Sequence, residues 1–328
     1  MALGCGSARA EPAESGYVTK TADGRDRVGC KLHELGVVVV TGMHPVDGHR
    51  TSLRTLTPMA RTLSDAQVVD VARRHETARV TRTSIRRSTL DHPEMTLDDA
   101  YACQKAWVDR QIADGASVIG HKIGLTSRAM QLAMKIDEPD FGTLLDYMAI
   151  ANHASFRADD FLDPKLEVEL AFVLSHDLDG SVVTTHTVLD ATAYVTPALE
   201  LIDARSFRVD PVDKVARNVC DTISDNAADA GIVTGDLRVA PRERDLRWVG
   251  AIAKRNGSVE ETGVAAGVLD DPVQGIVWLA RRLHGLGITL RAGEIILCGS
   301  FTRPIDCRRG DHFDVDFGDL GRITVDVE

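Results

Sequence analysis

Polar and apolar residues alternate over residues 163–174, DPKLEVELAFVL, as expected of a β-strand. Successive side chains in a strand point to opposite faces, so one face of this segment is entirely apolar: Leu166, Val168, Leu170, Phe172 and Leu174. The other face carries Glu167 and Glu169 side by side, next to a continuous apolar run. Neighbouring carboxylates repel each other, and burial increases the repulsion. The pattern therefore indicates either a half-solvated strand edge or a cation held between the two glutamates.

Three other stretches have the periodicity of amphipathic helices. Helices are predicted over residues 60–78, 95–115 and 271–287. In the second, Thr96 and a carboxylate three residues later have the spacing of a capping box. In the third, Asp271 precedes a proline and is the expected N-cap.

Short apolar segments separated by Gly, Asp and Pro predict strands over residues 117–125, 166–174, 196–202, 231–236, 246–257, 293–300 and 322–327. Helices and strands do not alternate as βαβ units, so we expect an α+β fold with a mostly antiparallel sheet. Within residues 223–231, ISDNAADAG, we expect Asp225 or Asn226 to cap a short helix that supports the strands.

The predicted elements divide the chain into three parts. Residues 1–62 are rich in Gly, Arg and Thr and lack periodicity, which predicts a poorly ordered extension or a wrongly assigned start, with Met43 or Met59 as the true one. Residues 63–115 form a helical N-terminal portion, and residues 116–328 form a β-rich domain.

Composition excludes several classes of function. The formal net charge of −11 argues against a nucleic-acid partner. No apolar run reaches the roughly 18 residues that span a bilayer, so no membrane association is expected. The six cysteines have no paired spacing, which argues against a zinc site or a disulfide framework and favours the cytoplasm.

The segment 196–205, TPALELIDAR, supplies a third acidic residue. Glu200 shares a strand face with Ala198 and Ile202 and has apolar neighbours. Three glutamates from two strands would form an all-oxygen site, for which Mg²⁺ is the natural occupant. The alternative is a set of solvated edge glutamates paired with a lysine such as Lys165.

Several motifs occur in order along the chain, among them GHKIGLTSRAMQ, DEPDFGTLLDYM, PKLEVELAFVL, PALELIDAR, ISDNAADAGIVTGD and GEIILCGSFTRP. Together they resemble the fumarylacetoacetate hydrolase superfamily, in the hydratase and decarboxylase branch of aromatic meta-cleavage pathways. The likeness covers residues 63–328. It implies a mixed β-roll domain with a helical N-terminal portion, dependence on Mg²⁺ or Mn²⁺, and a homo-oligomer such as a decamer.

The resemblance also implies roles for particular residues. Glu167, Glu169 and Glu200 match the metal ligands, Lys122 the active-site lysine, and Asp140 its acid/base partner. Without the resemblance, Lys122 would be read as a surface lysine and Asp140 as an ordinary turn residue. Beside a bound cation in a dry cleft, we expect the pKa of the lysine to fall.

The implied activity is metal-dependent hydration of 2-oxohept-4-ene-1,7-dioate to 4-hydroxy-2-oxoheptane-1,7-dioate in homoprotocatechuate catabolism. Ser300, Thr302 and Arg303 are the expected readers of the distal carboxylate, and Arg205 is a second candidate. Arg303 could instead pair with Asp306 or another surface carboxylate. The alternatives are hydration of 2-hydroxypenta-2,4-dienoate, decarboxylation of 4-oxalocrotonate, C–C hydrolysis, or a non-catalytic scaffold for a pathway enzyme.

Overall fold

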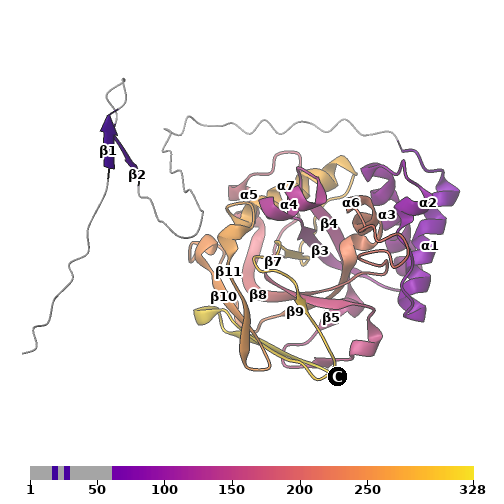
Figure 1. Ribbon diagram of the computed structural model, residues 1–328. Helices are drawn as coiled ribbons and strands as arrows, with labels where there is room; N and C mark the ends of the chain where they lie inside the picture. The colour runs from indigo at the N-terminus through magenta and orange to yellow at the C-terminus, as the bar shows by residue number, and fades with distance from the viewer. Residues whose placement is uncertain (1–16, 21–25, 30–60) are drawn as a thin grey trace, which may run out of the picture. The chain divides into compact units, whose positions relative to one another are not determined.

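The computed structural model describes residues 17–20, 26–29 and 61–328, and the chain divides into two compact units, residues 1–55 and 56–328 (Figure 1). In the first unit, strands β1 (Tyr17–Lys20) and β2 (Asp26–Gly29) pair antiparallel. Apart from these strands and residues 61–62, the extension predicted over residues 1–62 lies outside the described residues. The predicted division of the rest of the chain at residue 115 stays a prediction.

An eight-stranded sheet lies at the centre of the second unit, in the order β4-β3-β12-β7-β8-β9-β5, with β13 also paired to β7. The bounds are β3 Val118–Gly124, β4 Asp140–Leu145, β5 Ala149–Ile150, β7 Pro164–Leu174, β8 Thr192–Asp203, β9 Asp229–Thr234, β12 Ile295–Leu297 and β13 Ile305–Asp306. In this sheet only β3–β12 and β5–β9 pair in parallel. The prediction of a mostly antiparallel α+β fold is confirmed.

A second sheet has five strands in the order β11-β10-β14-β15-β6. Their bounds are β6 Ser155–Phe156, β10 Gly250–Arg255, β11 Ser258–Val264, β14 His312–Asp316 and β15 Arg322–Val327. Strands β10 and β11 form a hairpin around Asn256 and Gly257, two residues that readily adopt the positive φ angles of such turns. In Figure 1, β10 and β11 lie on the side of this unit away from helices α1 and α3.

The helices are α1 Asp65–Thr81, α2 Ser88–Asp91, α3 Leu97–Ala113, α4 Arg128–Met134, α5 Thr185–Ala191, α6 Val219–Ser224 and α7 Pro272–Gly285. The expected N-caps Thr96 of α3 and Asp271 of α7 are confirmed, and Thr96 forms the full capping box. Of the two predicted caps, Asp225 ends α6 and precedes the short 3₁₀ helix Asn226–Ala228, but its side chain forms no capping hydrogen bond there. The side chain of Asn218 caps the start of α6. Among the described helices, none is long and apolar enough to cross a membrane.

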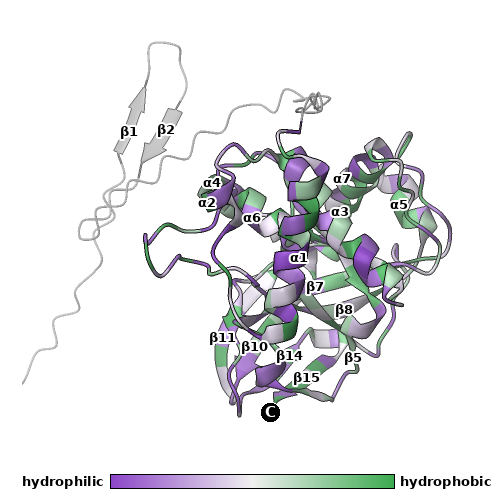
Figure 2. Cartoon of the chain, turned by 90° about the vertical axis from the view of Figure 1, so that its right-hand side faces the viewer, coloured by the Kyte–Doolittle hydropathy of each residue, from purple (hydrophilic) through white to green (hydrophobic). Residues whose placement is uncertain are grey.

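Both faces of β7 contact the interior of the unit. Its apolar face, from Leu166 to Leu174, is buried in the main core. On the opposite face, Ala171 packs with Ala198 of β8 and Leu297 of β12 in a smaller buried cluster. Figure 2 shows α1 in front of β7 and β8, with hydrophilic positions along much of the helix. The glutamates of β7 share the face of Ala171 and therefore point into the unit.

Candidate metal and active site

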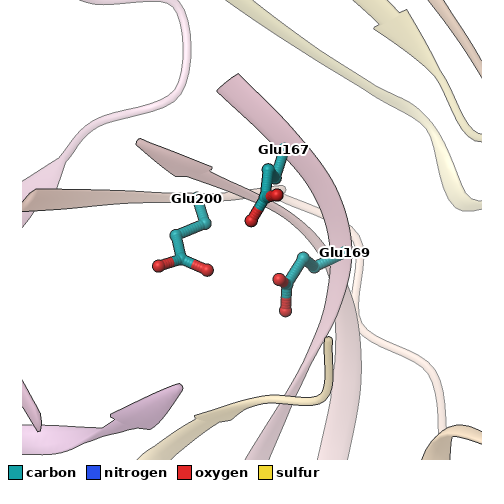
Figure 3. Close-up of side chains that lie close together, drawn as sticks. All are labelled: Glu167, Glu169 and Glu200. Carbon is teal, nitrogen blue, oxygen red and sulfur yellow. The ribbon is translucent and has the colours of Figure 1, made fainter. Parts of the chain in front are cut away.

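The three predicted glutamates meet on one face of the pair β7–β8. Glu167 lies directly opposite Glu200 in the antiparallel register, and Glu169 is two residues further along β7. Residues directly opposite each other in such a pair point to the same face. One carboxylate oxygen from each glutamate lies within 4.8 Å of the others, and Figure 3 shows the three side chains converging. We refer to Glu167, Glu169 and Glu200 as the glutamate cluster.

The environment of the glutamate cluster disfavours three negative charges. Glu169 and Glu200 are fully buried, and neither Glu169 Oε1 nor Glu200 Oε2 has a hydrogen-bond partner. Glu200 Oε1 is in an ion pair with Lys122 but accepts no hydrogen bond of good geometry. Burial raises the pKa of Glu167 to about 7, with a further contribution from Glu200. Burial and the same neighbour raise the pKa of Glu169 well above its ordinary value. Unpartnered carboxylate oxygens crowded in a dry site fit a hard divalent cation.

The alternative of solvated edge glutamates is wrong for this strand pair. Glu169 and Glu200 have no exposed surface, and Glu167 is only partly exposed. Lys165, the expected partner of edge glutamates, pairs with Asp306 instead. Lys165 therefore does not neutralise the glutamate cluster.

Lys122 supplies a buried positive charge next to the glutamate cluster. It lies on β3 and is 3% exposed, and its Nζ is 3.0 Å from Glu200 Oε1. The reading of Lys122 as a surface lysine is therefore wrong. Burial by itself lowers its pKa, but Glu200, Asp140 and Asp229 outweigh burial and raise it above the ordinary value. The fall in the pKa of Lys122 was expected for a site with a bound cation. The acidic side chains of the protein alone raise this pKa.

Asp140 is the first residue of β4 and not a turn residue, because β4 pairs with β3 and sets Asp140 opposite Gly124. It is 2% exposed, and its Oδ1 has no hydrogen-bond partner. Burial raises its pKa to about 6, with Lys122 acting to lower it and Glu200 to raise it. A carboxyl with such a pKa can exchange a proton near neutral pH.

The loop after β12 lies against the glutamate cluster. The amide of Gly299 donates a 2.8 Å hydrogen bond to Glu169 Oε2. Ser300 Oγ donates to the carbonyl of Thr302 at 3.0 Å, whereas the hydroxyl of Thr302 is buried without a partner. The amide of Gly299 contacts the cluster, and the two predicted substrate-binding residues Ser300 and Thr302 follow Gly299 in the same loop.

The two predicted arginines have other partners. Arg205 is 3% exposed and donates to the main-chain carbonyls of Asp225 and Asp229 at 2.9 and 2.7 Å. The side chain of Arg303 is 84% exposed and forms an ion pair with Glu261 at 2.7 Å. The sequence left open such a pairing with a carboxylate other than Asp306. Their assignment to the substrate stays a prediction.

Asp229 is a buried acidic residue near the site that sequence reasoning missed. It begins β9, has no exposed surface, and neither carboxylate oxygen has a hydrogen-bond partner. Burial, followed by the charge of Glu200, raises its pKa well above the ordinary value. The only signal in the sequence is an acidic residue immediately before an apolar strand, which is common and weak.

Comparison with known proteins identifies the family. The family model described as the C-terminal part of fumarylacetoacetate (FAA) hydrolase matches residues 116–328. This chain belongs to the fumarylacetoacetate hydrolase family. The match includes every residue of the site described above.

Among curated relatives, the 2-oxo-hept-4-ene-1,7-dioate hydratase of Escherichia coli is 52% identical over 77% of this chain and 95% of its own length. The 2-keto-4-pentenoate hydratase of Paraburkholderia xenovorans is 38% identical over 72% of this chain and 86% of its own. A solved structure of 4-oxalocrotonate decarboxylase from Pseudomonas putida G7, complexed with magnesium and adipate, is 31% identical. It matches with a TM-score of 0.78 and covers 82% of this chain and all of its own.

Proposed function

We propose that this protein is a hydro-lyase that hydrates 2-oxohept-4-ene-1,7-dioate to 4-hydroxy-2-oxoheptane-1,7-dioate with the help of Mg²⁺. The observation that carries the proposal is 52% identity to the E. coli hydratase named for this substrate, over 95% of that enzyme. The relative named for a five-carbon substrate is 38% identical. The buried glutamates and lysine support catalysis over a scaffold role, because unpaired buried charges are costly without a function.

Glu167, Glu169 and Glu200 are the proposed ligands of the cation. Their carboxylate oxygens converge and lack other partners, apart from the amide of Gly299 on Glu169 and the ammonium of Lys122 near Glu200. A relative of 31% identity is complexed with magnesium, which supports Mg²⁺ as the occupant, and Mn²⁺ has the same ligand preferences. When bound, the cation would polarise the 2-oxo group and stabilise the negative charge that develops as a proton leaves C3.

Asp140 is the proposed proton carrier, and Lys122 is the proposed hydrogen-bond donor to the negative charge that develops on the substrate. One proton leaves C3 of the substrate and one returns at C5, which moves the double bond next to the keto group. Water then adds its hydroxyl at C4 and its proton at C3. Asp140, with a pKa of about 6, can accept and return a proton at neutral pH. Lys122 stays protonated next to Glu200 and can donate a hydrogen bond to developing negative charge.

The loop after β12 is the proposed reader of the distal carboxylate. Ser300 and Thr302 follow Gly299, whose amide binds Glu169, and Thr302 has a buried hydroxyl without a partner. Arg303 follows in the same loop and could exchange Glu261 for a substrate carboxylate. Arg205 remains the second candidate, although its guanidinium already binds two main-chain carbonyls. The resemblance to the family is the basis for proposing a cytoplasmic homo-oligomer.

The test compares kcat/KM for the seven-carbon dioate and for 2-hydroxypenta-2,4-dienoate in the presence of Mg²⁺. The ultraviolet absorbance of the dienol monitors both reactions. Wild type and Arg303→Ala are measured together. Arg308→Ala is the matched control, since Arg308 is also exposed and pairs with a surface carboxylate. We expect wild type to prefer the seven-carbon substrate and Arg303→Ala to lose about 10- to 100-fold in kcat/KM on that substrate alone.

Each other outcome redirects the proposal. Preference for the five-carbon dienoate would assign the protein as a pentadienoate hydratase, and release of carbon dioxide from 4-oxalocrotonate would assign it as a decarboxylase. A seven-carbon preference that survives Arg303→Ala would keep the function and exclude Arg303 as the carboxylate reader. Turnover of none of these compounds would favour the scaffold role.

A further inference from the structure

A strained turn connects α6 to β9. Residues 226–228 have φ angles of 50°, 51° and 60°, and two of them are alanines. Three consecutive non-glycine residues in the left-handed region are unfavourable and persist only when the surrounding structure imposes them. Asn226 is held by two hydrogen bonds to the main chain of Thr143 on β4, at 2.9 and 3.0 Å. This turn leads directly into Asp229.

A β-bulge follows the turn. Gly231 pairs with Leu201 of β8, but Asp229 pairs with Ile202, so Ala230 is an extra residue on β9. One extra residue changes the face to which the preceding side chain points, and bulges often redirect a side chain next to an active site. Without the bulge, Asp229 would lie one position further along β8 and point to the opposite face. With it, Asp229 shares the face of Ile202, which is also the face of the glutamate cluster.

On the face of the glutamate cluster, the carboxyl of Asp229 has no hydrogen-bond partner in the protein. It has no exposed surface, and neither oxygen accepts a hydrogen bond of good geometry, although the amide of Ala230 lies nearby. Asp203, a buried carboxyl on the opposite face of β8, instead accepts main-chain hydrogen bonds from Leu162 and Asp163. A buried carboxyl without a hydrogen-bond partner is unfavourable, so a strained turn that produces one suggests a ligand.

The neighbours of Asp229 limit what that ligand can be. Asp229 lies outside the group of carboxylates whose oxygens converge within 4.8 Å, so it is not part of the proposed metal site. Lys122 pairs with Glu200 instead of with Asp229. A substrate carboxylate would be repelled by the surrounding acidic groups. A neutral hydrogen-bond donor such as water or a hydroxyl satisfies a carboxyl oxygen without adding charge.

We propose that Asp229 is a further catalytic residue, which accepts a hydrogen bond from the water that adds to C4. As the C4–O bond forms and the water O–H bond breaks, Asp229 takes that proton, Asp140 delivers a proton to C3, and Asp229 then contacts the new hydroxyl of the product. This inference rests on the proposed hydratase function and adds a residue to it. It separates two tasks in one site. Asp140 transfers the proton at C3 with Lys122 stabilising the negative charge, whereas Asp229 positions the water.

The experiment measures the two half-tasks separately in Asp229→Ala and Asp229→Asn with Mg²⁺. Exchange of the C3 protons of saturated 2-oxoheptane-1,7-dioate for deuterium, followed by NMR, reports enolisation without water addition. Hydration of 2-oxohept-4-ene-1,7-dioate reports the whole reaction. Asp203→Asn is the matched control, because it alters a buried carboxyl on the opposite face of β8.

We expect the ratio of hydration to exchange to fall about 100-fold in Asp229→Ala and about 10-fold in Asp229→Asn, because an amide still binds water but accepts no proton. The ratio stays unchanged in Asp203→Asn. An unchanged ratio of hydration to exchange in either folded Asp229 variant overturns the inference, even if both reactions become slower by the same factor. Wild type that hydrates only the five-carbon dienoate contradicts the proposed substrate alone, and the ratio is then measured on that dienoate. Wild type that hydrates neither overturns both.

Discussion

Two glycines allow the charged side chains of the site to approach one another. A Cβ atom at Gly124 would lie 2.2 Å from Asp140 Oδ1. One at Gly142 would lie 2.7 Å from the main-chain oxygen of Asn226 and 3.1 Å from Lys122 Cε. Contacts below 3.0 Å require a neighbouring atom to move, and both affected side chains are buried. The absence of a side chain at Gly124 therefore leaves room for the carboxyl of Asp140, and its absence at Gly142 allows the main chain of Asn226 and the side chain of Lys122 to approach β4.

Gly124→Ala should displace the Asp140 carboxyl while leaving the sheet intact. A displacement of about 1 Å in a catalytic group can cost 100-fold in rate, so we expect kcat to fall by roughly that factor. Gly285→Ala is the control, because nothing lies within 4 Å of a Cβ there and alanine favours the helix by up to about 1 kcal/mol. Steady-state kinetics and thermal unfolding of both variants test this, and full activity in Gly124→Ala would exclude the positional role of the glycine.

At the scale of elements, the link between β4 and the turn before β9 holds two parts of the site together. Asn226 both donates to and accepts from the main chain of Thr143, as a neighbouring strand would. These bonds join the strand that carries Asp140 to the segment that carries Asp229. The turn is therefore a structural bridge as well as a source of strain.

Asn226→Ala should destabilise the fold by about 2–4 kcal/mol, because it leaves a buried amide and a buried carbonyl of Thr143 unpaired. Ala228→Gly is the comparison, since glycine adopts its φ of 60° without strain. We expect the free energy of unfolding to change by less than about 1 kcal/mol in that variant. Urea denaturation measures both, and equal stabilities of the two variants would show that the bridge contributes little.

At the scale of the whole molecule, the buried carboxyls couple stability to pH and to the metal. The pKa values of Glu167 and Asp140 are raised to about 7 and about 6, so between roughly pH 4 and 7 the folded protein binds more protons than the unfolded chain. For these groups the free energy of unfolding is therefore highest at low pH and falls as pH rises through this window. Carboxyls with lowered pKa, such as Asp210 at about 2, titrate below it.

In EDTA, the melting temperature should fall between pH 5.5 and 8 as the site carboxyls ionise. The increase in melting temperature on adding Mg²⁺ should grow over the same range, because the cation binds ionised carboxylates. In Glu167→Gln, we expect a flatter dependence on pH in EDTA and a smaller effect of Mg²⁺. Differential scanning calorimetry provides the measurement. A metal effect that is largest at pH 5.5 would contradict the assignment of the glutamate cluster.

Local patterns in the sequence determined the elements and the faces of the individual strands. The alternation in residues 163–174 separated the apolar face of β7 from the face of Glu167 and Glu169, because side-chain direction in a strand depends only on its period of two. The capping signals at Thr96 and Asp271 likewise located two helix starts, because each cap involves only residues of the first turn.

Pairing between distant segments decided the rest. The register that sets Glu167 opposite Glu200, the β3–β4 pairing that makes Asp140 a strand residue, and the bulge that redirects Asp229 all join residues more than 15 positions apart. Burial of the charges also followed from this pairing and from the helices packed around it. Such contacts depend on the fit of the whole sheet, and no single segment contains the energy that selects them. The strand faces in the sequence therefore pointed to the three glutamates, and only the family resemblance pointed to Lys122 and Asp140. The mutual geometry of these residues and the position of Asp229 came from the tertiary structure.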